Sequence, residues 1–163
     1  MFGNLSCVYD ELGRNEEALQ MRRDVYSGTL ELYGEEHRDT LGDSSNYAMS
    51  LVDLQRFEEA KAVLRRTVPV ARRVMGEGHD LTLKMRKMYG RSLCEDPAAT
   101  LDDLREAVTT FEEIERIARR VLGSDHPFTV ALETSLRSAR AALRANETGD
   151  MSSVCEALRT AEV

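Results

Sequence analysis

Four landmarks recur in the same order along this chain, and their spacing constrains the fold more than any other feature. Each set begins with an alanine that follows a glutamate, has a glycine sixteen residues later, and then a histidine and a threonine at further intervals of three. The glycines are Gly34, Gly76 and Gly123, so the period is 42 residues and then 47. All three histidines of the chain occupy one position of this pattern. The chain is therefore built from repeats.

Between the alanine and the glycine, apolar residues follow the period of an α-helix. In the second repeat they stand 0, 3, 4, 7, 11, 14 and 15 residues after the alanine, which places them on one face of a helix. This apolar stripe runs into the last turn, to Leu32, Val74 and Val121. The first repeat has Arg22 within the stripe, and we expect its stem to lie along the core edge with its charge in water.

The residues around these stripes predict where helices end and begin. A glycine in the left-handed conformation ends each long helix, and Pro127 suits the first turn of the following one. Ser27-Gly28 and Pro69 fall inside long helices, where proline removes a hydrogen bond and clashes with the preceding turn. Because the apolar stripe continues past both places, we expect bent helices rather than broken ones.

Each repeat then consists of two antiparallel helices, a shorter A helix and a longer B helix, joined by a tight turn. One such hairpin cannot cover its own apolar face, so neighbouring hairpins must stack to form a core. We predict an all-α, right-handed superhelical solenoid of stacked antiparallel helical hairpins. It forms a single repeat domain over 1–163, with repeats at approximately 2–37, 38–79, 80–126 and 127–163, the first and last incomplete.

Composition and charge exclude several classes of protein. Acidic residues number 29 and basic residues 22, for a net charge of −7, which disfavours a nucleic-acid binder. No apolar run approaches 18 residues, and the N-terminus has no basic stretch followed by an apolar one. The three cysteines include no Cys-x-x-Cys pair. We expect a cytoplasmic protein that binds neither nucleic acid nor membranes.

The sequence also argues against catalysis and against metal or cofactor binding. It has none of the phosphate-binding, zinc-protease or serine-nucleophile motifs. Loops in successive repeats should lie roughly 20 Å apart, by two helix–helix distances, whereas zinc ligands lie about 2 Å from one ion. We therefore expect the histidines to shape their loops, and we expect no enzyme, metal or cofactor.

The cysteines, Cys7, Cys94 and Cys155, are read mainly as small buried hydrophobic residues. A reactive cysteine needs a lowered thiol pKa, and such a pKa follows from nearby positive charge. Cys94 alone has such a hint, since it follows a basic run.

The repeated phrases resemble a known family. A small residue, a turn and Glu-Glu-Ala are similar to the tetratricopeptide repeat, which is ordinarily 34 residues long. The 42-residue period and the Gly-x-x-His-x-x-Thr loop resemble the repeats of kinesin light chains, in the phrases Gly34-Glu35-Glu36-His37, Gly76-Glu77-Gly78-His79 and Gly123-Ser124-Asp125-His126-Pro127. The resemblance covers roughly residues 3–145.

This resemblance implies that the A helices line a concave groove that holds partner peptides. Aligning the repeats puts eight residues on the groove side: Asn4, Cys7, Asn46, Met49, Lys84, Lys87, Met88 and Arg91. From Thr82 to Cys94 the chain has four basic residues and no acidic one, and three of them, Lys84, Lys87 and Arg91, share one helix face with Met88. Asparagine amides can bond an extended peptide backbone. We expect an interaction scaffold or adaptor whose groove binds an acidic peptide.

Three alternatives stay open. The basic run is a solvated face if Arg86 and its neighbours pair with Glu112, Glu113 or Glu115. The chain is a structural spacer, or a homo-oligomer joined through uncapped end helices, if it is one segment of a longer solenoid in a multidomain regulatory protein. It is a ligand-sensing regulator if an enzyme or nucleotide-switch domain is attached to it.

Overall fold

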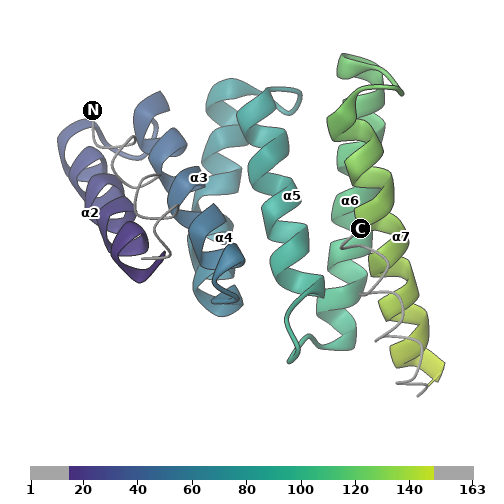
Figure 1. The fold of residues 1–163 in the computed structure, drawn as a ribbon. Helices are drawn as coiled ribbons and strands as arrows, with labels where there is room; N and C mark the ends of the chain where they lie inside the picture. The colour runs from purple at the N-terminus through teal and green to yellow at the C-terminus, as the bar shows by residue number, and fades with distance from the viewer. Residues whose placement is uncertain (1–14, 149–163) are drawn as a thin grey trace. The chain divides into compact units, whose positions relative to one another are not determined.

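The computed structural model describes residues 15–148, and all regular structure in this range is α-helical. The helices are α2 (Asn15–Tyr33), α3 (Arg38–Asp53), α4 (Phe57–Met75), α5 (Asp80–Cys94), α6 (Leu101–Leu122) and α7 (Pro127–Thr148) (Figure 1). The pairs α3–α4 and α5–α6 are the A and B helices of the second and third repeats. Helix α2 is the B helix of the first repeat and α7 the A helix of the fourth. The predicted all-α fold of helical hairpins is confirmed.

Two details of the helix boundaries test the sequence reading. Helix α7 begins at Pro127, as predicted, but its 22 residues make it longer than the other described A helices, α3 with 16 and α5 with 15. Helices α2 and α4 each continue without a break, through Ser27-Gly28 and through Pro69. The predicted residues Asn4, Cys7 and Cys155 lie outside the described range.

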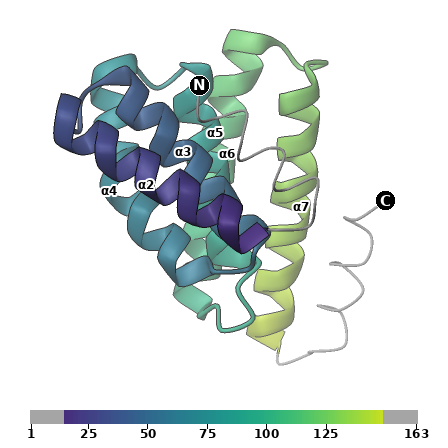
Figure 2. The same ribbon diagram turned by 60° about the vertical axis from the view of Figure 1, so that its left-hand side comes forward.

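The chain divides into two compact units, Met1–Met88 and Tyr89–Val163, and the division falls within α5. In the N-terminal unit, α3 packs against both α2 and α4. In the view of Figure 2, α2 lies in front of α3. Six buried residues of these three helices form one hydrophobic cluster: Leu19, Tyr47, Leu51, Val52, Phe57 and Ala60. Tyr26 stacks on Tyr47 with ring centroids 6.2 Å apart. This cluster fixes the A–B hairpin of the second repeat against α2.

In the C-terminal unit, α6 packs against α7. The buried residues of these two helices include Phe111, Ile114, Leu132 and Leu136. Gly90, near the C-terminal end of α5, lies so close to α6 that an added Cβ would stand 2.7 Å from two ring carbons of Phe111. A glycine is therefore required for the two helices to cross at this distance.

The apolar stripe ends earlier than the sequence pattern predicts. Ala71 and Ala118 are fully buried, but Leu32, Val74 and Val121 in the last helical turns are exposed by 76%, 42% and 51%. The prediction that these three residues belong to the core is wrong. The 3.6-residue period continues past the point at which a neighbouring helix covers it, and periodicity alone does not show that point.

Glycines end the B helices as predicted, and the backbone shows why no other residue serves. Gly34, Gly76 and Gly123 have φ of 82°, 92° and 92°. The ψ values of Gly76 and Gly123 are 162° and 163°, which is extended rather than left-handed helical. That combination of angles is essentially restricted to glycine.

Candidate peptide-binding surface

The histidines cap the A helices. The Nδ1 atoms of His37, His79 and His126 each accept a hydrogen bond at 3.2 Å from the backbone N–H two residues later, in Asp39, Leu81 and Phe128. Each Nδ1 is the acceptor in this contact, so this nitrogen carries no proton there. The bond satisfies one of the backbone donors that a helix start leaves open. The predicted loop-shaping role thus has a specific geometry.

The threonine of the same motif ties each loop to the preceding helix. Thr40, Thr82 and Thr129 are buried. The Thr40 and Thr82 hydroxyls donate to backbone oxygens within the preceding helix, those of Thr29 and Ala71. The Thr129 hydroxyl donates to the backbone oxygen of Gly123, directly after the preceding helix. The Gly-x-x-His-x-x-Thr motif therefore combines a helix end, a helix start and a hydroxyl clamp. Its residues are engaged in shaping the turn.

Asn46 and Met49 lie one helical turn apart on α3 and are both exposed, Met49 by 43%. Met49 lines an open depression of about 270 Å³, together with Asn15, Arg22, Ser50, Asp53 and Leu54. Arg22 donates through Nη1 to the Ser50 hydroxyl, so its guanidinium lies between α2 and α3. The Met49 side chain therefore lines the depression together with an amide (Asn15), a cation (Arg22) and a carboxylate (Asp53).

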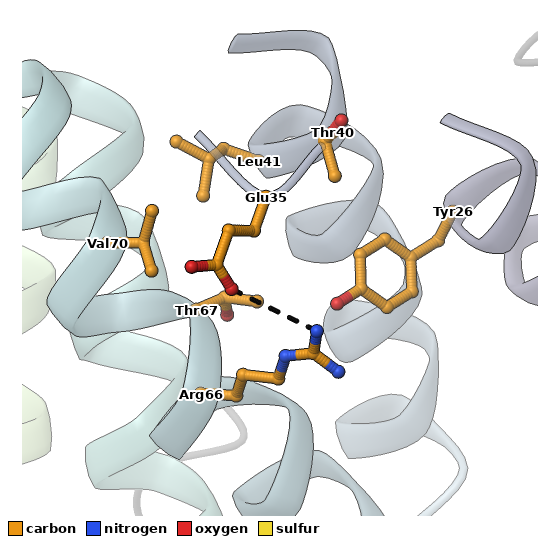
Figure 3. A pocket seen from close by; sticks show the side chains of 7 residues that line it. All are labelled: Tyr26, Glu35, Thr40, Leu41, Arg66, Thr67 and Val70. Atoms are coloured by element: carbon orange, nitrogen blue, oxygen red, sulfur yellow. Dashed lines mark ion pairs between the residues drawn. The ribbon is translucent and has the colours of Figure 1, made fainter. Parts of the chain in front are cut away.

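A second hollow in the N-terminal unit is too small for a peptide side chain. It lies between α2, α3 and α4, and Figure 3 shows Tyr26, Glu35 and Arg66 at its rim, with an ion pair of 3.9 Å between Arg66 Nη2 and Glu35 Oε2. Its volume is about 10 Å³, at the lower limit for one water molecule. Burial raises the pKa of Tyr26 above its usual value, partly offset by the charge of Arg66. The hollow is a packing defect beside the core.

The basic run on α5 is engaged with carboxylates of its own unit. Lys84 Nζ lies 2.6 Å from Asp80 Oδ2, and Arg91 makes two hydrogen bonds to Glu95, at 2.8 and 3.0 Å. Lys84 is well exposed, whereas Lys87 is partly buried. Arg91 lies beyond the division of the chain, in the C-terminal unit.

Two residues of α5 are more buried than the sequence predicts. Met88 is 8% exposed, because it belongs to the buried face of the helix, so little of it is available to a peptide. Arg86 is also buried, and its Nη1 lies 3.0 Å from Glu77 Oε2 in the preceding loop. Of the expected partners, Glu112 pairs with Arg140 and Glu115 with Arg119.

Cys94 is not activated. Burial, reinforced by the charge of Glu95, raises the pKa of its thiol to about 12. The hint of a lowered pKa was wrong, because the nearby Arg91 is neutralised by its contact with Glu95. Cys94 is only partly buried, whereas the sequence reading expects a buried residue.

The sequence reasoning missed a second group of cations, on α7. Arg137, Arg140 and Arg144 stand at intervals of three and four residues, and the stretch from Thr134 to Asn146 holds no acidic residue. Together with Arg119 of α6 they line an open depression of about 420 Å³. The same signal that drew attention to α5, a basic run without acids, was present here.

Two kinds of site are absent from the part of the chain that the structure describes. No group of three His, Cys, Asp or Glu side chains between residues 15 and 148 is arranged to hold a metal ion. Among the helices of this range, none combines the length and hydropathy needed to cross a membrane.

Comparisons with known proteins place these features in context. A family model described as "Tetratricopeptide repeat" matches residues 1–39 and 45–80. Two crystal structures of a Podosopora anserina kinesin light chain with nearly identical TPR-like repeats, one of them a single-substitution variant, are similar in fold. The variant has a TM-score of 0.71 and the other structure 0.68; each is 21% identical, and the match covers 97% of this chain and 70% of that one. No curated protein sequence matches this chain.

Proposed function

Because the chain is a tetratricopeptide-repeat protein whose repeats resemble those of kinesin light chains, we propose that it is an interaction scaffold that binds a partner peptide. The peptide lies along the exposed faces of α3 and α5 in the N-terminal unit. The observation that carries the proposal is Met49, a large apolar side chain exposed beside Asn46 and at the edge of a depression. An apolar side chain flanked by backbone-binding amides is suited to anchor an extended peptide.

The preference for acidic partners rests on Lys84 and Lys87. Lys84 and Asp80 are both more than half exposed and stand four residues apart, and such pairs contribute only about 0.3–0.5 kcal/mol. A carboxylate of a partner can therefore replace Asp80 at little cost. Arg91 belongs to the C-terminal unit and is held by two bonds to Glu95, so it is the less available cation.

The test begins with peptides selected from a random library against the intact chain. Met49→Ala and Lys84→Gln should each weaken binding of the selected peptides several-fold, and the effect of Lys84→Gln should diminish as salt rises. Arg23→Gln is the matched control, since Arg23 is an exposed cation on α2 that does not line the depression. Equal affinities for all four proteins would refute the proposed surface.

The alternative function is that of a structural spacer or self-associating segment. It is favoured by exposed aliphatic side chains that recur at one repeat position, Leu32, Val74 and Val121. Sedimentation over a range of concentrations separates the two functions. Association that is abolished by Leu32→Ser and unaffected by Met49→Ala would favour the alternative.

A further inference from the structure

The geometry points to a second docking surface, on α7 in the C-terminal unit, that accepts an acidic segment of a partner protein. This surface shares no residue with the proposed surface on α3 and α5. Its cations are Arg137, Arg140 and Arg144.

The register of the repeats shows what this face of α7 is. The residue eleven positions after the loop histidine is Ala48 in α3, which is fully buried, and Gly90 in α5, which lies against Phe111 of α6. Three positions further on, Leu51 and Leu93 are both fully buried, and Leu51 belongs to the hydrophobic cluster that includes Phe57 and Ala60 of α4. In the second and third repeats, this face of the A helix is therefore packed against the B helix of its own repeat.

In α7 the same positions are cationic and exposed. Arg137 and Arg140 replace the small residue and the leucine, and Val130, equivalent to the buried Leu41 and Leu83, is 50% exposed. An apolar helix such as α4 cannot cover this face without burying two guanidinium groups, which is unfavourable unless they are paired. An occupant of this face must therefore bring carboxylates.

The charges beside the depression are only partly balanced. Arg119 bonds both Glu115 and Glu133, at 2.8 and 2.7 Å, and Arg140 lies 2.7 Å from Glu112. No ion pair joins Arg137 or Arg144 to a carboxylate among residues 15–148. Arg137 and Arg144 stand about two helical turns apart, beside a depression of about 420 Å³, and so complement successive carboxylates of an acidic segment.

The test uses the full chain and a fluorescently labelled oligo-glutamate peptide, with oligo-glutamine as the uncharged probe. The unaltered chain should bind oligo-glutamate and not oligo-glutamine. The double variant Arg137→Ala/Arg144→Ala should bind about tenfold more weakly, since each exposed pair contributes modestly. Arg116→Ala/Arg120→Ala is the matched control: it removes the same charge from exposed positions of α6 that do not line the depression. Thermal unfolding of each variant shows whether the fold is kept.

Failure of the α7 surface can be told apart from failure of the proposed peptide surface on α3 and α5. If only Lys84→Gln weakens binding of oligo-glutamate, or if both double variants weaken it equally, the assignment of the α7 surface is overturned. Failure of the unaltered chain to bind oligo-glutamate overturns it as well. If Arg137→Ala/Arg144→Ala instead abolishes concentration-dependent association and leaves peptide binding unchanged, the occupant is a second copy of the chain, and the assignment to a partner is wrong.

Discussion

At the scale of single residues, the recurring histidines illustrate how far a sequence pattern leads. Their fixed phase and expected separation predicted a role in the loops, and each one accepts a backbone N–H as a helix cap. The pattern could not indicate which ring nitrogen accepts. It also could not show that the neighbouring threonine would be the buried member of the motif, because both are polar and the loop itself is short.

The cap can be tested at His126, whose Nδ1 accepts from Phe128 at the start of α7. His126→Ala should lower the free energy of unfolding by about 1 kcal/mol, the usual effect of losing a side-chain cap. His126→Asn should retain most of the stability, because an asparagine oxygen accepts the same bond. Urea unfolding of both variants provides the measurement. Equal losses would show that the imidazole acts through packing rather than as an acceptor.

Cys94 leads to a pH dependence. Burial raises the pKa of its thiol to about 12, above the value of about 8.5 expected in the unfolded chain. The unfolded state therefore loses its proton first, and the resulting stability is complete below about pH 8.5 and decreases as pH rises toward 12. Between pH 8.5 and 10, the free energy of unfolding should fall less steeply for Cys94→Ala than for the unaltered chain. Parallel curves would mean that the thiol is accessible to water in the folded state.

At the scale of helices, the spacing of apolar residues, glycines and proline predicted where the helices lie better than it predicted which of their residues are buried. Helix ends marked by glycine and a helix start marked by proline lie where expected, because these signals act through the local backbone. The exposure of Val74 and Val121 and the burial of Met88 depend on which neighbouring helix covers each turn. The cations of α5 illustrate the same limit, since periodicity does not show that Asp80 and Glu95 will engage them.

Two glycines inside helices should respond oppositely to the same substitution. Gly28 in α2 has nothing within 4 Å of an added Cβ, so Gly28→Ala should stabilise the protein by about 0.5–1 kcal/mol. Gly90 in α5 would place the Cβ 2.7 Å from Phe111, so Gly90→Ala should destabilise it by about 1–3 kcal/mol. Denaturant midpoints measure both effects. A stabilising Gly90→Ala would contradict the close helix crossing in the C-terminal unit.

At the scale of the whole molecule, the sequence predicted the all-α repeat fold and its resemblance to tetratricopeptide repeats, and the exposure of the candidate contacts only in part. Asn46, Met49 and Lys84 are exposed, whereas Met88 is buried and Asn4 lies outside the described residues. The α7 arginines form a sparser basic run than the cations of α5, so they give a weaker signal in the sequence. Whether a cation is available depends on its neighbours in space, which a single sequence does not provide.

The central claim is that a partner peptide contacts Met49, and methionine methyl NMR tests it most directly. The chain has seven methionines; Met49 is 43% exposed and Met85 is fully buried, so Met85 is an internal control. On titration with a selected peptide, the Met49 methyl resonance should shift saturably, with the same affinity that fluorescence reports, while Met85 stays unchanged. A peptide that binds with measurable affinity and leaves the Met49 resonance unmoved would contradict the account.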